Sequence, residues 1–371
     1  MKTALVMIVK NEQENIVRAL ESVKDQFEVF VINYSGTDDE TVEVGTEWME
    51  ANGKDGMWIS PEWKGAADGL NACIEFCENL EVDWILRMDA DTVYEGPTPD
   101  FENLNELCDA VEVDIIRADG SFIASRPWWF KPNCKYRGVR HEGLYANFRT
   151  KNEDIFIRHH DDSGARPRSP ETYADDFHAM GNELPVEYDA DMAKRYCFYM
   201  ANSARDGGDL FQAALWFRIR MLMGGYESEV QVATREHALI IMQAPFWLDA
   251  IHQHPTRPDM VFWALATGDQ FGTPFKAQVL EIAEPDSWIT GQMFCQDEYM
   301  WKALDSIALV HGELGHMEKH QELTEEILSK REEYDIPDGD LVRLLSRIGL
   351  DDEAAAIQKS LAEQQQVLEE E

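Results

Sequence analysis

The stretch DWILRMDAD, residues 83–91, decides how this sequence folds. It is an apolar strand that delivers two carboxylates, Asp89 and Asp91, into a loop. Hard oxygen ligands on a short loop suit Mg²⁺ or Mn²⁺, and a diphosphate can fill the remaining coordination positions. A D-x-D pair is a weak signal in a chain with 71 acidic residues. Its place behind a strand favours a metal site over a solvated acidic turn.

Strands and helices alternate before this stretch. Residues 4–9 and 29–32 are apolar runs typical of buried strands, and residues 57–59 form a further short strand. Residues 11–23 and 65–79 have the apolar spacing of helices. This alternation predicts a parallel sheet with right-handed crossovers, whose ligands bind beyond the carboxyl ends of the strands. Those ends carry Lys10-Asn11-Glu12, Asn33-Tyr34-Ser35 and Asp89-Ala90-Asp91.

The rest of the chain has a different pattern. Residues 122–168 are rich in Trp, Arg and His, and we expect them to be irregular. Helical hairpins are predicted over residues 193–223, 301–330 and 341–361, with glycines at their turns, and they resemble degenerate tetratricopeptide hairpins. Residues 245–296 fit no repeat.

The predicted architecture has two domains. The fold class is α/β, with a Rossmann-like, mostly parallel sheet domain over residues 1–180, followed by an α-helical, repeat-like domain over residues 181–371. A helical domain of this kind can present a concave surface to a protein partner or form a homodimer.

The charge of the chain is strongly acidic. It has 33 basic and 71 acidic residues, a net charge of −38, so we expect no general nucleic-acid binding. Residues 126–168 reverse the balance, because they hold ten basic and five acidic side chains. An anionic ligand would explain such a segment.

Cysteine usage and hydropathy bear on location. The six cysteines are scattered without a C-x-x-C pair, which favours small buried hydrophobic residues in a reducing compartment. No run approaches the roughly 18 apolar residues of a membrane helix, so we expect no membrane insertion. The apolar N-terminal run is better explained as a strand than as a signal peptide, and we expect a cytoplasmic protein.

Several motifs in order resemble one family. MIVKNE (7–12), NYSGTDDET (33–41) and WILRMDAD (84–91) look like family 2 glycosyltransferases of the GT-A fold. RGVRHE (137–142) and IRHH (157–160), followed by helical hairpins, resemble the bacterial subset that joins this domain to tetratricopeptide-like repeats.

The resemblance implies an inverting transfer of a sugar from a nucleoside diphosphate donor, with uridine the expected nucleoside. It places Val9, Glu12 and Asn33 beside the nucleoside, and Asp89 and Asp91 on the metal and diphosphate, with Asp91 the more direct ligand. The sequence departs from the family twice. Asn33 stands where an Asp is usual, which leaves the base preference open, since an amide can donate or accept. Leu70 stands where Arg is frequent, immediately before Asn71.

The chemistry also needs charge on the departing diphosphate and a base for the acceptor. Arg137, Arg140 or Arg158 is expected to assist the metal. Glu142, beside His141, is the preferred base, against the alternative that Glu142 only pairs with Arg140 or Arg137. Asp161 and Asp162 are the reserve candidates for the base.

Two further pairs of residues are candidates for the site. His160, rather than His159, is the preferred third metal ligand, and a structural histidine is an equal alternative. Trp128 and Trp129 are expected in the core rather than stacked on a sugar.

Other functions stay open at this stage. A sugar nucleotidyltransferase shares the sheet, but the loop after the first strand has no glycine. A catalytically silent binding or scaffold protein would use only the helical region. The acceptor, which can be a glycan, a protein or a modified nucleobase, is not identified by the sequence.

Overall fold

The computed structural model describes residues 1–104, 107–118, 120–160, 169–187, 189–289, 295 and 297–370, without the side chains of 363–370. The chain divides into two compact units, Met1–Gly225 and Tyr226–Glu371. The first therefore contains the sheet and the three helices that follow it. Whether the catalytic domain itself ends at residue 180 stays a prediction.

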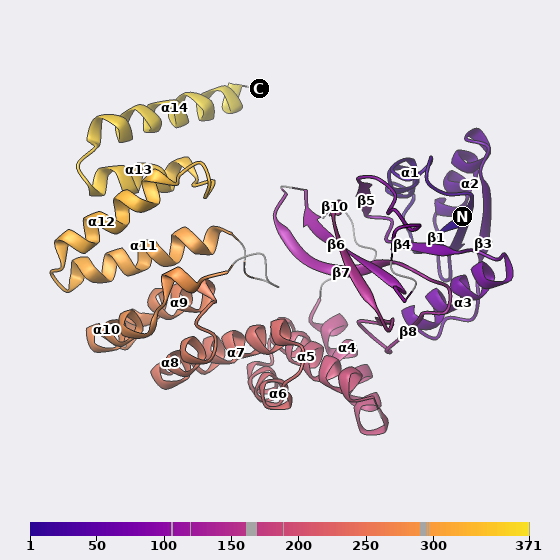
Figure 1. Ribbon diagram of the computed structural model, residues 1–371, viewed down its shortest axis with the longest axis horizontal. Coiled ribbons are helices and arrows are strands. Elements are labelled where there is room, and N and C mark those ends of the chain that lie inside the picture. Colours follow the sequence, from indigo (N-terminus) through magenta and orange to yellow (C-terminus); the bar gives the residue numbers. More distant parts are fainter. Residues whose placement is uncertain are drawn as a thin grey trace. The chain divides into compact units, whose positions relative to one another are not determined.

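Four parallel strands form the N-terminal half of the sheet. They lie in the order β3-β2-β1-β4. Strands β3, β1 and β4 are labelled in Figure 1. Their bounds are Thr3–Ile8 for β1, Val29–Asn33 for β2, Asp55–Ile59 for β3 and Trp84–Met88 for β4. The connecting helices are α1 (Ile16–Glu21), α2 (Thr41–Ala51) and α3 (Ala66–Asn79). All four predicted strands are confirmed. Helix α1 begins later than predicted, after Asn11 takes a left-handed φ of 57°.

The other half of the sheet corrects one prediction. Residues 122–168 were expected to be irregular, but they contain β7 (Phe122–Phe130), β10 (Arg149–His159) and a hairpin of β8 (Lys135–Arg137) and β9 (Gly143–Tyr145). With β5 (Thr92–Glu95) and β6 (Ala110–Arg117) the sheet has eight strands, ordered β3-β2-β1-β4-β7-β6-β10-β5. Pairing β6-β10 is also parallel, so the sheet is mostly parallel, as predicted. Strand β10 is hard to predict because its first half is exposed and carries charged side chains. Polar and apolar residues therefore do not alternate clearly along it.

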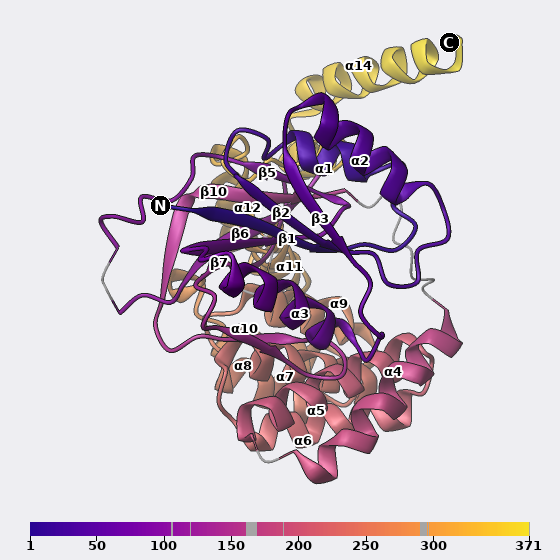
Figure 2. The same cartoon turned by 90° about the vertical axis from the view of Figure 1, so that its right-hand side faces the viewer.

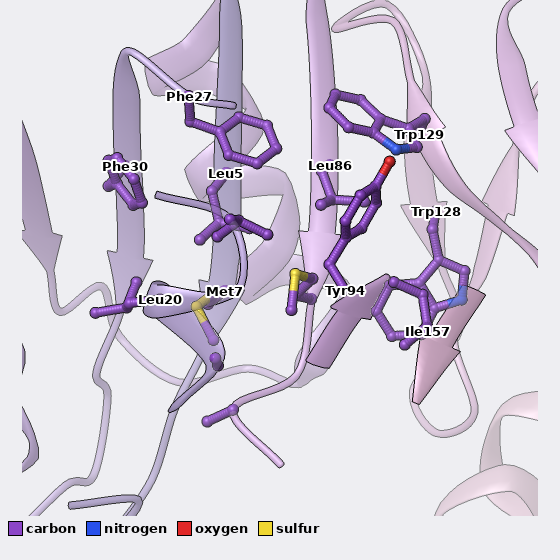
Figure 3. Close-up of a cluster of buried hydrophobic side chains, with 14 of the residues drawn as sticks. Leu5, Met7, Leu20, Phe27, Phe30, Leu86, Tyr94, Trp128, Trp129 and Ile157 are labelled. Carbon is purple, nitrogen blue, oxygen red and sulfur yellow. The ribbon is translucent and has the colours of Figure 1, made fainter. Parts of the chain in front are cut away.

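Helices cover both faces of the parallel half (Figure 2). Leu5 and Met7 point to the α1 and α2 side, whereas Ala4 and Val6 point to the α3 side, as the two-residue period of a strand requires. Figure 3 shows the first of these cores. Trp128 and Trp129 are buried there, which confirms their expected place in the core.

One glycine sets how closely α3 approaches the strand ends. A Cβ on Gly69 would lie 2.8 Å from Asn33 Nδ2 and 3.1 Å from Ile8 Cδ1. Any side chain there would push α3 away from the ends of β1 and β2.

Three helices complete the first unit: α4 (Pro170–Glu183), α5 (Ala190–Asp206) and α6 (Leu210–Met223), with a 3₁₀ turn at Leu184–Val186. Helix α5 begins at a strong N-cap, since the Asp189 carboxylate accepts hydrogen bonds from the backbone N–H groups of Asp191 and Met192. The predicted hairpin over residues 193–223 is confirmed as α5 and α6.

The second unit is helical throughout its described residues. Its helices are α7 (Glu227–Ile241), α8 (Ala244–Gln253), α9 (Pro258–Ala266), α10 (Thr273–Ile282), α11 (Glu298–Glu313), α12 (Met317–Ser329), α13 (Asp338–Arg347) and α14 (Asp351–Glu370), with 3₁₀ turns at Gly268–Gln270 and Pro285–Ser287. The two hairpins predicted here are confirmed as α11–α12 and α13–α14.

The six cysteines are all free and buried, as predicted. No helix in the described part of the chain has the length and hydropathy to cross a lipid bilayer.

Candidate active site

Asp89 and Asp91 lie in the turn that follows β4, where the parallel strands present their carboxyl ends. The Asp91 carboxylate is held through Oδ2, which lies 3.1 Å from Nε2 of His159 at the end of β10, the strand that pairs with β5. Its other oxygen, Oδ1, is buried and has no hydrogen-bond partner among the described residues. A buried carboxylate oxygen without a partner is rare, because its desolvation is not offset.

The carboxylates near this turn repel one another. Burial raises the pKa of Asp89, Arg87 opposes this, and the charges of Asp91 and Glu142 raise the pKa further. Burial also raises the pKa of Glu12, with further contributions from Asp91 and Asp89 against a hydrogen bond from Asn15. The site therefore favours an additional positive charge.

Arg87 joins this turn to the predicted base. Its Nη2 lies 2.9 Å from Asp89 Oδ1 and 3.4 Å from Glu142 Oε1, and its guanidinium stands 5.3 Å from the Trp128 ring. Burial alone would raise the pKa of Glu142, but Arg87 and other nearby groups outweigh it, and the net pKa is lowered. Glu142 is therefore ionised at neutral pH, and its partner is Arg87 rather than either arginine expected from the sequence.

Helix α5 holds the backbone of the turn that carries Glu142. His141 has a left-handed φ of 52°, which is uncommon for a residue with a side chain. The Arg195 side chain donates from Nε to the His141 carbonyl oxygen at 2.6 Å and from Nη2 to that of Glu142 at 3.4 Å. Tyr199 stacks on the His141 ring, with centroids 3.8 Å apart and planes 7° apart. Helix α5 thus holds both the backbone and the side chain of His141 in this conformation.

The same contacts set the charge of His141. Desolvation lowers its pKa to about 4, and although Asp176 opposes this, the Arg195 cation lowers it further. The imidazole is therefore uncharged at neutral pH, and it can donate or accept a hydrogen bond.

A cavity of about 650 Å³ lies beside Glu142 and joins the strand ends to α5. We call one portion of its lining the strand-end part: Ile8, Lys10, Ser35, Gly36, Trp63 and Ala66. The remainder, from β7, the β8–β9 turn and α5, we call the arginine-rich part: Arg126, Val139, Arg140, His141, Glu142, Arg195 and Tyr199. A volume of this size suits a small-molecule substrate.

The structure places several predicted residues away from this cavity. Arg137 stacks on Tyr145 at 4.3 Å and pairs with Asp189 at 3.5 Å. Arg158 binds Glu95 through two nitrogens, at 2.6 and 2.8 Å. Neither is among the residues that line the cavity.

The basic segment of residues 126–168 is consequently not one patch. Lys135, Arg149 and Lys151 pair with acidic residues elsewhere on the unit, at 2.9 to 3.4 Å. Within the described residues, Arg126 and Arg140 are its two members in the cavity, and Arg140 pairs with Asp176 at 2.7 Å. Arg166 and Arg168 lie outside the described residues.

The predicted nucleoside contacts meet at the ends of β1 and β2. Val9 is buried, and its N–H donates to the Asn33 carbonyl oxygen at 2.8 Å. Asn33 is fully buried as well: its Oδ1 accepts from the Ser35 N–H at 2.9 Å, and its Nδ2 donates to the Gly69 carbonyl at 3.3 Å. In this arrangement Ser35, not Asn33, faces the cavity.

The geometry distinguishes His159, the last residue of β10, from His160, which follows it. The ring beside Asp91 belongs to His159, whereas His160 contacts Asp91 through its backbone N–H, which donates to the Asp91 carbonyl at 2.9 Å. His160 as a metal ligand stays a prediction. The reserve bases Asp161 and Asp162 lie outside the described residues.

Sequence reasoning missed Arg87, Arg195 and Tyr199. Arg87 carried a signal, since a charged residue inside an otherwise apolar buried strand needs a partner. The two α5 residues gave none, because they lie more than 50 positions beyond the turn that they support.

The residues at the end of β4 fit a hard divalent cation. Asp91 offers a buried oxygen without a partner, and Asp89 offers Oδ2, the oxygen that does not face Arg87. Oxygen donors of this kind suit Mg²⁺ or Mn²⁺. The described residues contain no ready-made group of three metal-ligating side chains, so a bound diphosphate or water would have to complete the coordination.

The fold and the site define a class: an α/β domain with paired carboxylates at the carboxyl edge of a parallel sheet. Comparison with known families then finds that residues 4–166 match the family described as Glycosyl transferase family 2. This part of the chain, less than half of its length, is similar to that family, as the sequence motifs implied. The remaining residues lie outside the match.

The solved structures to which this chain is similar are distant in sequence. One is S. aureus TarS 1–349 in complex with UDP-GlcNAc, with 11% identity, a TM-score of 0.38, and coverage of 67% of this chain and 89% of that chain. Another is glucosyl-3-phosphoglycerate synthase from Mycobacterium tuberculosis in complex with Mn²⁺, UDP-Glc and phosphoglyceric acid, with 17% identity, a TM-score of 0.24, and coverage of 31% and 44%. Comparison with curated proteins finds no match. Likenesses this distant do not identify a substrate.

Proposed function

We propose that this protein is an inverting glycosyltransferase that moves a sugar from a nucleoside diphosphate donor, most consistently a UDP-sugar, to an acceptor hydroxyl. The observation that carries the proposal is the buried Asp91 oxygen without a partner, in the part of the chain that is similar to glycosyl transferase family 2. The acceptor hydroxyl belongs to a glycan, a protein or a modified nucleobase.

A divalent cation, Mn²⁺ or Mg²⁺, would be held by Asp89 and Asp91, and when bound it supplies positive charge against the diphosphate. His159 orients Asp91 through its 3.1 Å contact, since carboxylates that bind a metal are commonly held by hydrogen bonds of their own. Val9, Glu12 and Ser35 border the nucleoside at the strand ends.

Glu142 is the base. Its carboxylate accepts the proton of the acceptor hydroxyl while the acceptor oxygen forms a bond to the anomeric carbon and the diphosphate leaves with the electrons of the broken bond. Arg87 keeps Glu142 ionised and holds it next to the Asp89 turn. Neutral His141 and the ring of Tyr199 shape the cavity wall beside it.

We also propose that the helical hairpins of the second unit bind a protein partner or a second copy of the chain. They resemble tetratricopeptide repeats, which typically present a surface for a partner or a second copy. No feature of the described residues favours a purely structural role over catalysis.

Thermal unfolding with nucleotides tests the donor site. UDP, CDP, GDP and dTDP are added with and without Mn²⁺ to the wild type and to Asp91→Asn. A ligand at 100 times its Kd stabilises a protein by about 2.7 kcal/mol, so one nucleotide should raise the midpoint by several degrees only when Mn²⁺ is present. Asp91→Asn should abolish this shift, and Asp249→Asn, an exposed change in the second unit, should keep it.

The same variant has a second expected result. Without ligands, Asp91→Asn should be as stable as the wild type or more stable by up to about 1 kcal/mol, because it relieves repulsion with Asp89 and Glu12. If no nucleotide shifts the wild-type midpoint under any condition, the donor site does not exist.

A further inference from the structure

The charges around the proposed base point to the class of acceptor. The arginine-rich part of the cavity brings Arg126, Arg140 and Arg195 together beside one carboxylate, Glu142. This is a local reversal in a chain with more than twice as many acidic as basic residues. A neutral acceptor would gain little from three guanidinium groups, whereas a phosphate or carboxylate is their natural ligand.

The three arginines differ in the partners of their guanidinium groups. Arg140 is paired with Asp176 at 2.7 Å, so its charge is largely neutralised. Arg195 donates to the carbonyl oxygens of His141 and Glu142, which are not anions. Arg126 is exposed on β7, and the described residues include no hydrogen bond or ion pair to its side chain. The positive charge at the cavity wall therefore comes from Arg195 and Arg126, and the Arg195 nitrogens Nε and Nη2 already donate to backbone carbonyl oxygens.

The charge of Arg126 acts to lower the pKa of both Asp89 and Glu142, and its side chain lines the cavity beside Glu142. The diphosphate would have its own countercharge in the cation that Asp89 and Asp91 would hold, and neither residue is among those that line the cavity. Arg126 lies instead in the part that contains Glu142, where the acceptor hydroxyl must stand if Glu142 is the base. The stacked rings of His141 and Tyr199 offer a flat wall next to it.

We infer that the arginine-rich part is the acceptor site, and that it takes a hydroxyl compound carrying a phosphate or carboxylate group, which Arg126 binds. This inference rests on the proposed function for the role of Glu142. Lys10 is a cation in the strand-end part of the same cavity, and we assign it to the donor rather than to the acceptor.

The test is a thermal titration at constant ionic strength, made with and without UDP and Mn²⁺. The probes are glycerol 3-phosphate, inorganic phosphate, glycerate and glycerol. Constant ionic strength matters, because screening alone stabilises so acidic a chain. The two phosphates and glycerate should raise the unfolding midpoint in a saturable manner, and glycerol should not.

Variants assign the effect. Arg126→Gln should weaken the apparent affinity for glycerol 3-phosphate by about 10- to 100-fold while leaving the UDP and Mn²⁺ shift intact, because a charged hydrogen-bond partner is lost only on the acceptor side. Arg126→Lys should retain most of the affinity. Arg331→Gln, the same charge change at an exposed arginine of the second unit, should alter neither shift.

Several results would overturn the inference. Glycerol could be as effective as glycerol 3-phosphate, or the anion shift could survive in Arg126→Gln. If Arg126→Gln abolished the UDP shift, Arg126 would serve the donor diphosphate, and the proposed function would still stand. If UDP failed to bind the wild type while the anions bound through Arg126, the proposed function would fail and the anion site would remain.

Discussion

At the scale of single residues, Arg87 is the position on which the proposed chemistry depends most. It lies inside a buried strand, yet it faces two carboxylates with different tasks, Asp89 at 2.9 Å and Glu142 at 3.4 Å. A general base works best when its pKa is near the working pH. Arg87 instead lowers the pKa of Glu142. Glu142 is therefore fully ionised and held in place, but it is a weaker base than a carboxylate with a higher pKa.

Replacing Arg87 should therefore change the pH profile. Without its cation the pKa of Glu142 rises towards the value that burial favours, so a larger share of Glu142 is protonated at mildly acidic pH. The acid limb of kcat/KM should move to higher pH in Arg87→Gln, and Arg87→Lys should move it back part of the way. An unchanged acid limb in Arg87→Gln would show that Glu142 is not the titrating base.

At the scale of elements, sequence reasoning predicted the first four strands and the helical hairpins, because their apolar periods are strong. It failed for β7 and β10. Strand β7 includes Arg126 and Pro127, and β10 carries charges along its exposed half, so neither has a clear period of two. Asp89, Asp91 and Glu142 were found from short motifs, whereas Arg195 and Tyr199 approach Glu142 only through the packing of α5.

Helix α5 makes its own prediction. Its side chains hold His141, which has a left-handed backbone, next to the base. Loss of these contacts should displace Glu142 and leave the donor site unchanged. Arg195→Gln and Tyr199→Leu should lower kcat by about 10- to 100-fold, since a displacement near 1 Å costs about that much. Tyr199→Phe keeps the stacked ring and should retain most of the activity.

The measurement is steady-state kinetics together with the UDP-dependent shift of the unfolding midpoint. That shift should be the same in all three variants and in the wild type. If Tyr199→Leu kept full activity, stacking on His141 would have no part in placing the base. A loss equal in Tyr199→Phe and Tyr199→Leu would instead assign the effect to the hydroxyl group.

At the scale of the whole molecule, the question is where the catalytic part of the chain ends. The family match ends at residue 166 and the sequence predicts a boundary at 180, but the compact first unit extends to Gly225. The difference is α5 and α6, and α5 supplies Arg195 and Tyr199 to the cavity. A catalytic domain cut before α5 would lose the support of the His141 turn and expose buried residues of the Met180, Met192, Tyr196 and Met200 cluster.

We therefore expect fragments 1–225 and 1–180 to behave differently. Fragment 1–225 should unfold cooperatively and keep the nucleotide shift in the presence of Mn²⁺, because it retains every residue that lines the cavity. Fragment 1–180 should unfold at a lower temperature, and any nucleotide shift that it keeps should not be accompanied by transfer activity, because the base is no longer held. Equal activity in the two fragments would place the boundary at 180 and remove α5 from the catalytic machinery. Loss of folding in both would mean that the first unit needs the helices beyond Gly225 for its stability.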